Sequence, residues 1–401
     1  MRAAAEFGRN PNPLAQHYSR FRVAERVLLT GHSHQAWPDT ARDGMLAAWD
    51  DAASEVDEKW ERAEAQADRV RHGFARLLGD RSGVVALGQN THELVIRFLS
   101  ALDLRGRPRL VTTDGEFHTL RRQLDRIAEQ GGIEVVRVPS SPAASVAERL
   151  VSALDDRTAA VLVSSVLYTN AHLVPGLGSV LAACRRRGAE LLVDAYHQLN
   201  VVPFSIEGEG LEDSFIVGGG YKYCQLGEGN CFLRVPPGRE WMRPLLTGWF
   251  SEFSRLADRA EAGVAYGAGP ARWAGSTYDP TSHYRAARVF DFFEEQGLDP
   301  PLLRAISRRQ VSLLAESLDA LDLEPRVASR DRSVPLEQVG GFLAITCSDA
   351  ERLHAGLRER GVRTDYRGNV LRLGPAPYLN DDQLRAGVHA LGEVARAGVM
   401  R

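Results

Sequence analysis

Lys222 is the residue of this sequence best suited to chemistry on a carbonyl group. The chain has 401 residues and 49 lysine plus arginine residues, of which only Lys59 and Lys222 are lysines. Lys59 lies in the charged run DEKWER and is interpreted as a solvated side chain, whereas Lys222 lies between two tyrosines after three glycines. Lysine can lose its proton and attack a carbonyl carbon, which arginine cannot do. The position therefore favours a lysine that forms a Schiff base over a purely structural one.

Asp194 is expected to meet Lys222 in one crevice. The segment AELLVDAYHQ is a short apolar run that ends in Asp194, with His197 three residues on, and FIVGGGYKY is a second apolar run that leads to Lys222. Ligands of open α/β sheets collect where the strands end. Pyridoxal 5'-phosphate (PLP) requires this pair, a lysine for its aldehyde and an acid that keeps its pyridine nitrogen protonated. An aspartate after a strand is often a helix cap, so the inference depends on the pair.

A strand–turn–helix pattern in VVALGQNTHELVIRFLSAL offers a place for the phosphate of such a cofactor. Asn90 and Thr91 stand at the start of the expected helix, where free backbone N–H groups and the positive end of the helix dipole attract anions. Plain capping of the helix by either residue is the alternative, and both can hold together. We assign this turn to the phosphate because Lys222 lies downstream.

The motifs around Lys222 resemble those of the class V aminotransferase superfamily, which has fold type I of the PLP enzymes, and within it the kynureninases. The motifs that carry the resemblance are DAYH (194–197), GYKY (220–223), GWF (248–250) and TDYRGNVLRLGPAPYLN (364–380). The resemblance implies an α/β fold with a mostly parallel, seven-stranded type of sheet in a large domain and a small α+β C-terminal domain. It also implies a homodimer with shared active sites.

The resemblance implies roles for further residues near the cofactor. Tyr221 corresponds to the family's proton-transfer tyrosine, and His197 would orient Asp194 or the ring hydroxyl. Phe117 and Thr119 match the family's F-P-[ST]-D element, in which Phe117 would stack on the cofactor ring; a core contact is the alternative. Trp249 and Thr277 would reach the phosphate held by the neighbouring subunit, with Ser276 as the alternative to Thr277 and core packing as the alternative for Trp249.

Three residues are expected to bind the substrate. His32 and Ser33, in the turn GHSHQ, resemble the family's G-N-S-L-G element at the substrate pocket, although a loop with His32 and His34 in solvent fits the sequence as well. Arg372, near the end of an expected strand, has a planar fork that would bind a substrate carboxylate with two hydrogen bonds. The sequence departs from the family pattern at His32, Leu120, Leu167 and Ser251, which leaves the substrate open.

Alternating strands and helices from about 83 to 235 predict a mostly parallel sheet with helices on both faces. Helices are expected at 283–296, 300–320 and 349–360, and strands near 340–347 and 370–373. We expect an N-terminal segment (1–45) that joins the small domain and the substrate loop, a large PLP-binding domain (46–285) and a small C-terminal domain (286–401).

The composition narrows the class of protein. A net charge of −3 argues against partners such as nucleic acids or a membrane surface. No apolar run is long enough to span a bilayer, and MRAAAEFGRNPN lacks the apolar core of a secretory signal. The cysteines, at 184, 224, 231 and 347, lack metal-ligand spacing, so we expect no metal and a cytoplasmic location.

The expected activity is a kynureninase-type hydrolysis of the Cβ–Cγ bond of kynurenine to anthranilate and alanine. The alternatives are a related aminotransferase or a β-eliminating C–S lyase acting on a different amino acid, and a non-catalytic PLP-binding paralogue. Retention of Lys222 in a chain with so little lysine argues against the paralogue. A cysteine desulfurase is disfavoured, because Cys347 in GFLAITC is predicted to face the core from a strand rather than to lie on a mobile loop.

Overall fold

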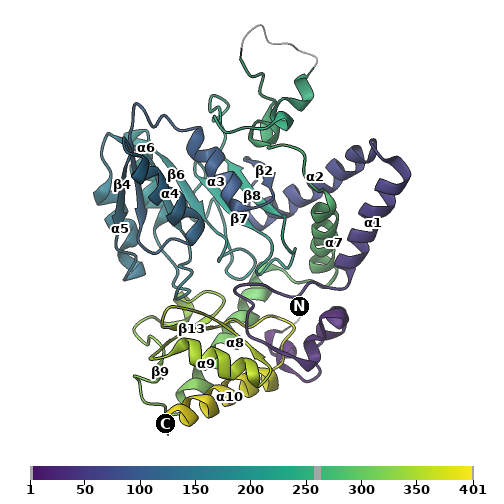
Figure 1. Cartoon of the computed structure of the whole chain (residues 1–401), viewed down its shortest axis with the longest axis vertical. Helices are drawn as coiled ribbons and strands as arrows, with labels where there is room; N and C mark the ends of the chain where they lie inside the picture. The colour runs from purple at the N-terminus through teal and green to yellow at the C-terminus, as the bar shows by residue number, and fades with distance from the viewer. Residues whose placement is uncertain (1–2, 257–262, 400–401) are drawn as a thin grey trace.

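A seven-stranded sheet forms the centre of the larger part of the molecule (Figure 1). The computed structural model describes residues 3–256 and 263–399. Strands follow the order β2-β8-β7-β6-β5-β3-β4, with β2 Val84–Gly88, β3 Arg109–Thr113, β4 Glu134–Val138, β5 Thr158–Ser164, β6 Glu190–Asp194, β7 Phe215–Gly219 and β8 Cys231–Val235. Strands β3 to β7 are parallel, and β8 is antiparallel to both β7 and β2. The predicted mostly parallel sheet is confirmed.

Helices cover both faces of this sheet because its central strands are apolar on both sides. Along β5, Val161 and Val163 pack in one core cluster, whereas Ala160 and Leu162 pack in another. The first cluster includes side chains of α5 (Val146–Ala153) and α6 (Leu177–Arg187), and the second those of α3 (Thr91–Ser100) and α4 (His118–Gln130). A strand buried on both faces has a continuous apolar sequence.

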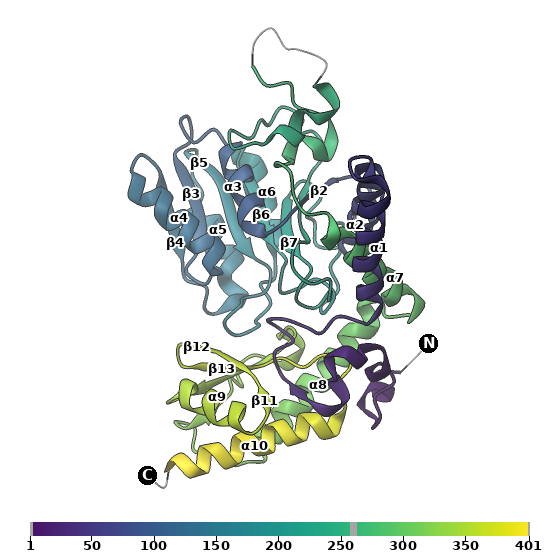
Figure 2. The ribbon, with the colours of Figure 1, turned by 45° about the vertical axis from the view of Figure 1, so that its right-hand side comes forward.

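A layer of long helices flanks the β2 and β8 side of the sheet, formed by α1 (Thr40–Glu55), α2 (Lys59–Leu78) and α7 (Thr281–Glu295) (Figures 1 and 2). Phe74 of α2 packs against Phe232 of β8 and Phe290 of α7, with ring centroids 4.5 and 5.6 Å away. Where α1 crosses α7, a Cβ on Gly44 would lie 2.5 Å from the carbonyl oxygen of Tyr284, so this close approach requires glycine.

The C-terminal part of the chain forms a second, four-stranded antiparallel sheet. Its order is β12-β13-β10-β9, with β9 Ala328–Ser329, β10 Leu343–Cys347, β12 Asp365–Arg367 and β13 Val370–Leu373. The helices α8 (Pro300–Asp319), α9 (Ala350–Glu359) and α10 (Asp381–Val399) belong to the same part (Figure 2). The helices predicted at 283–296, 300–320 and 349–360 are thus confirmed as α7, α8 and α9, and the two predicted strands as β10 and β13.

The N-terminal segment packs beside this second part, as Figure 2 shows. Its strand β1 (Val27–Leu28) pairs in parallel with β11 (Val362–Arg363). Before β1 the segment forms short 3-10 helices at Ala4–Gly8, Ala15–Phe21 and Val23–Glu25. Elsewhere in the described residues, 3-10 helices span Ala143–Ser145, Trp249–Arg255, Gly269–Trp273 and Leu336–Gln338. No helix among the residues described is long and apolar enough to cross a membrane.

Candidate active site

Two neighbouring strands deliver Asp194 and Lys222 to the same edge of the sheet. Asp194 is the last residue of β6, and β7, its parallel neighbour, ends at Gly219, three residues before Lys222. Between them the chain turns tightly, since a Cβ on Gly220 would lie 2.6 Å from the Cβ of Leu226. The glycines before Lys222 are therefore required by the shape of the turn that carries the lysine.

The amine of Lys222 is buried and faces His197. The lysine is 5% exposed, and its Nζ lies 2.8 Å from His197 Nε2 and 4.4 Å from the centre of the Tyr196 ring. Burial lowers the pKa of Lys222 to about 7, although the charge of Asp194 acts in the opposite direction. At neutral pH a large fraction of this amine is unprotonated, which is the form that attacks a carbonyl carbon.

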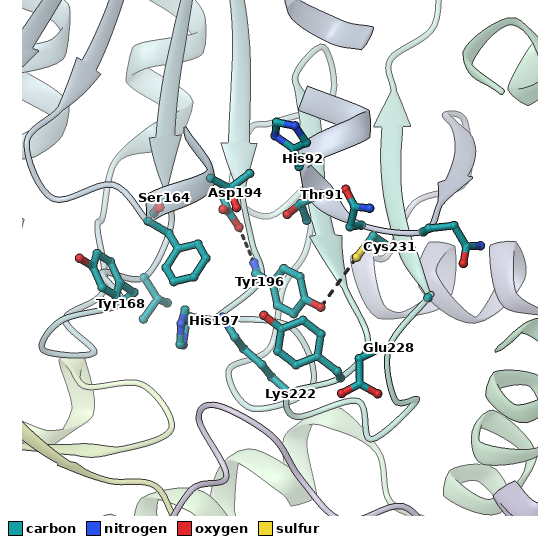
Figure 3. Close-up of a pocket in the computed structure, with 17 residues that line it drawn as sticks. Thr91, His92, Ser164, Tyr168, Asp194, Tyr196, His197, Lys222, Glu228 and Cys231 are labelled. Carbon is teal, nitrogen blue, oxygen red and sulfur yellow. Dashed lines mark hydrogen bonds between the residues drawn. The ribbon is translucent and has the colours of Figure 1, made fainter. Parts of the chain in front are cut away.

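Asp194 is the acid whose charge acts most strongly on that amine. Its carboxylate accepts a hydrogen bond from the backbone N–H of Tyr196 at 2.9 Å, and burial raises its pKa above the ordinary value. Figure 3 shows it above Lys222 across a cavity of about 230 Å³. Predicted site residues that line this cavity are Asn90, Thr91, Phe117, Thr119, Asp194, His197, Tyr221 and Lys222.

The turn before α3 reaches the same cavity. Asn90 caps the helix, since its Oδ1 accepts from the backbone N–H of Glu93 at 2.9 Å. Thr91, the first residue of α3, lines the cavity with its neighbour His92. The capping role of Asn90 and the anion-binding role of the helix start are compatible, as expected from the sequence.

Phe117 and Thr119 approach from the turn between β3 and α4. The Phe117 ring centre lies 5.3 Å from Lys222 Nζ and 5.3 Å from the ring of Tyr168, which it meets at 82°. Phe117 lines the cavity and is absent from the apolar clusters of the described core, so the alternative of a core contact is wrong. A flat ring in the cavity would meet this aromatic face.

His32, Asp365 and Arg372 form a second buried group outside the residues that line the cavity. His32 Nε2 lies 2.9 Å from Asp365 Oδ1, and Arg372 holds Asp365 with two hydrogen bonds of 2.7 and 2.6 Å. Arg372 also donates to the backbone carbonyl of Tyr168 at 2.6 Å. His32 is fully buried, so the interpretation of this histidine as solvent-exposed is wrong, whereas His34 is exposed.

The charges in this group follow from its burial. Burial lowers the pKa of His32 to about 4, so its imidazole is neutral and donates to Asp365. Burial alone would raise the pKa of Asp365, but the hydrogen bonds from His32 and Arg372 hold it below the ordinary value. Three of the five N–H groups of Arg372 are engaged within the protein, which leaves two for a ligand.

Ser33, Trp249 and Thr277 lie outside the residues that line the cavity. Ser33 Oγ contacts His34 Nδ1 at 3.1 Å, and Trp249 Nε1 donates to Thr277 Oγ1 at 3.1 Å. Trp249 is 44% exposed, so the alternative that it packs in the core is wrong. The structure thus brings Trp249 and Thr277 together, but not into the cavity of their own chain.

Several lining residues were not expected from the sequence. Tyr196 lies beneath Lys222 and contacts Cys231 Sγ with its hydroxyl at 3.8 Å. Its place two residues after Asp194 was the available signal. Ser164, Val166 and Tyr168 match a family element, S-H-V-N-Y, that follows a strand, whereas others carry no pattern that distinguishes them from loop residues: Gln89, His92, Glu228 and Gly229.

The residues fit PLP on an observation independent of sequence likeness. His197 Nδ1 is buried and has no hydrogen-bond partner within the described part of the chain. A neutral Lys222 amine can donate to His197 Nε2, which places the histidine proton on Nδ1 as a donor. A buried donor without a partner is costly, and a ligand oxygen in the cavity would satisfy it.

The chain matches no family model, but it is similar to several known proteins. It is 26% identical to isopenicillin N epimerase of Streptomyces clavuligerus over 79% of this chain and 81% of the relative. It is 24% identical to the uncharacterized aminotransferase YcbU of Bacillus subtilis (84% and 85% covered) and 23% identical to a kynureninase of Bacillus mycoides (73% and 68% covered).

Solved structures share the whole fold. The cystine C–S lyase C-DES, in complex with its product cysteine persulfide, superposes with a TM-score of 0.77 at 16% identity, covering 93% of this chain and 98% of that one. A cysteine desulfurase of Thermococcus onnurineus gives 0.78 at 15% identity, with 99% of each chain covered. With the arrangement of Lys222 and Asp194, these likenesses show a PLP-dependent enzyme with the type I fold, similar in sequence to an epimerase, an aminotransferase and kynureninases.

Proposed function

We propose that this enzyme hydrolyses the Cβ–Cγ bond of kynurenine or a closely similar amino acid, with PLP bound to Lys222. The observation that carries the proposal is the buried Lys222 amine, which has a pKa of about 7 and shares a cavity with Asp194 and His197. Kynureninases are among the relatives that align with most of the chain. Tyr221 lies directly before the lysine, where the resemblance to kynureninases implies a proton-transfer tyrosine.

Residues on three sides of the cavity would hold the cofactor. Asn90 and Thr91, with the start of α3, suit its phosphate, and Asp194 suits its ring nitrogen. His197 Nδ1 would donate to the ring hydroxyl, and Phe117 would cover the ring. PLP bound in this way supplies an electron sink for the bonds at the substrate α-carbon.

Lys222 is suited to move the proton at the α-carbon. A base works best when its pKa is near the working pH, and Lys222 meets that condition because it is buried. His197 stays neutral, since burial and the neighbouring charge of Lys222 both lower its pKa. The histidine therefore holds the lysine amine in place without competing with it for the proton. Tyr221, which stacks on His34 at the edge of the cavity, would serve later proton transfers.

Arg372 would bind the α-carboxylate of the substrate with its two remaining N–H groups. Because Asp365 and the Tyr168 carbonyl hold the other side of the guanidinium, its direction is fixed before the substrate binds. His32 would support this contact indirectly, through its hydrogen bond to Asp365. Ser33 would contact the substrate from the adjoining turn.

A C–S lyase or aminotransferase acting on a different amino acid is the second candidate. The observation that favours it is that the chain differs from the kynureninase pattern at His32, Leu120, Leu167 and Ser251, all of which are buried. The cystine lyase C-DES shares nearly the whole fold. Kynurenine specificity depends on such contacts, because a pocket discriminates through groups that a wrong substrate leaves unpaired.

We propose further that the enzyme is a homodimer, in which Trp249 and Thr277 of one copy reach the phosphate bound by the other. Within 241–256 the large side chains Trp241, Leu245, Leu246, Trp249, Phe253 and Leu256 are exposed, a concentration typical of an interface. The four cysteines are free and buried, which fits the proposed cytoplasmic location.

Mixed dimers test this shared site. Neither Lys222→Ala nor Trp249→Ala is expected to be active alone, but a refolded mixture should recover up to about a quarter of wild-type activity, because half of the dimers contain one complete site. A mixture without activity, or a monomer in light scattering, would contradict the dimer proposal.

Anthranilate fluorescence tests the substrate. The PLP-loaded enzyme should release anthranilate from kynurenine, and Lys222→Ala should release none. A protein that binds PLP but turns over cystine or another amino acid and leaves kynurenine intact would establish the second candidate instead.

A further inference from the structure

Glu116 is a buried carboxyl group beside the cofactor site that none of the roles above uses. It is 2% exposed and precedes Phe117 in the turn between β3 and α4. Its Oε1 accepts from Thr113 Oγ1 at 2.6 Å and from the backbone N–H of Ser164 at 3.2 Å, and its Oε2 lies 2.5 Å from Ser164 Oγ. Glu116 therefore ties the end of β3 to the end of β5.

This contact places Glu116 next to Asp194 in the sheet. Ser164, which Glu116 binds at both its backbone and its hydroxyl, is the register partner of Asp194 on the neighbouring strand. Burial above all, with the charge of Asp194 adding to it, raises the pKa of Glu116 to about 7 against the hydrogen bonds from Ser164 and Thr113. Asp194 and Glu116 thus lie at the same edge of the sheet. Of the two, only Asp194 lies close enough to Lys222 for the lysine charge to favour the ionised carboxylate.

The same strand–turn–helix lacks the acid expected after Phe117. Leu120, at that position, is 1% exposed and packs with Leu124 of the same helix in the core. A carboxylate in that apolar setting would lose its hydration without gaining a partner. Glu116, four residues earlier, has a matched set of hydroxyl and N–H partners and so is the buried acid that this segment contributes.

We propose that Glu116 is a positioning residue of the cofactor site: it fixes Ser164 beside Asp194 and, through its own charge, adjusts how tightly a proton is held on the cofactor nitrogens near Asp194. The inference rests on the proposed placement of PLP. When Glu116 is protonated, Asp194 is the negative charge at this edge; when Glu116 ionises, a second negative charge stabilises any nearby cation. The groups that face Glu116 directly, Thr113 and Ser164, are neutral.

The test is the pH titration of the visible absorption band of the PLP-loaded enzyme. Glu116→Gln keeps the shape of the side chain and one of its two accepting oxygens but cannot ionise. We expect it to move the midpoint of the band's transition down by about 0.5 to 1 pH unit, because a negative charge that favoured the protonated form is gone. Glu129→Gln, which changes an exposed acid on helix α4 just after this turn, is the control and should leave the midpoint unchanged.

A second variant tests the same inference in case Glu116→Gln does not fold. Thr113→Val removes a hydroxyl donor from Glu116 without changing a residue that lines the cavity. Since Glu116 then stays protonated to higher pH, the midpoint should move in the same direction by a smaller amount. Midpoints equal to that of the wild type in every variant that folds would overturn the inference. A wild-type protein without a PLP band would instead contradict the proposed function.

Discussion

Lys222 and Lys59 are the same side chain in two environments, and the difference decides their chemistry. Lys59 is the first residue of helix α2 and is only partly buried, whereas Lys222 is buried against His197 and the Tyr196 ring. Burial disfavours the charged amine, which lowers the pKa of Lys222 to about 7. A substitution of Lys59 is therefore the natural control for a substitution of Lys222.

Replacing each lysine by alanine should separate them. Lys222→Ala should lose the visible band of covalently bound PLP and reduce turnover by roughly 10²- to 10⁴-fold through loss of proton transfer alone. Lys59→Ala should keep both. Absorption spectra and steady-state rates measure the outcome, and a Lys222→Ala protein with an intact band would show that PLP is attached elsewhere.

The pKa of Lys222 also predicts how the apoprotein takes up PLP. The neutral amine is the reactive form, so a lowered pKa means that the rate constant of attachment rises with pH up to about 7 and levels off above it. For a lysine with an ordinary pKa, the rate constant of attachment would continue to rise at pH values far above 7. Stopped-flow mixing of apoprotein with PLP between pH 5.5 and 9, about two units to either side, distinguishes the two profiles.

At the scale of elements, a buried ion pair holds β8 in the sheet. Arg234 of β8 donates to Asp80 at 2.8 Å, in the turn after α2, and to the carbonyls of Glu212 and Ser214 just before β7. Its side chain is fully buried, as is nearly all of that of Asp80. Strand β8 is antiparallel to its neighbours and begins where the tight loop that carries Lys222 ends. The ion pair that holds β8 therefore also fixes the backbone around the lysine.

Asp80→Asn should therefore destabilise the protein far more than a surface change does. Removing one partner of a buried pair leaves an uncompensated charge, at a cost of about 3 kcal/mol or more. Asp156→Asn, which breaks the exposed pair with Arg187, should change the free energy of unfolding by less than about 1 kcal/mol. Urea unfolding of both variants gives the comparison; equal effects would refute the argument.

At the scale of the whole molecule, Arg372 connects the two sheets at the site. It lies on β13 of the four-stranded sheet and donates to the carbonyl of Tyr168, which follows β5 of the seven-stranded sheet. His32, from the N-terminal segment, reaches the same group through Asp365. The proposed carboxylate site is thus assembled from three distant parts of the chain.

Arg372→Ala should raise the KM for the amino acid by about 10²-fold or more while the PLP band remains, because a charge-assisted bidentate contact is lost. Arg358→Ala, which removes an exposed arginine of α9, should change neither quantity. A KM that stays constant in Arg372→Ala would place the carboxylate elsewhere.

Much of the site could be predicted because its signals are local. The apolar runs of β6 and β7 are continuous, Asp194 ends the first and Lys222 follows the second by three residues, and parallel strands end at a common edge. The same reasoning could not find Glu116, since an acid beside a turn looks like a surface residue until the strand that carries Ser164 is placed next to it. It also could not decide whether His32 lies in a solvent-exposed loop or in the substrate pocket, because the burial of a single histidine depends on what packs over it.

The sequence alone therefore determined the strand and helix succession, the choice of Lys222 and its pairing with Asp194, since these depend on neighbours along the chain and on the period of apolar residues. Only the tertiary structure decided that Arg372 is already held by Asp365, that Trp249 and Thr277 lie outside their own cavity, and that Glu116 is buried. Those outcomes depend on which distant surfaces meet, and burial and charge are set by that contact rather than by residue type.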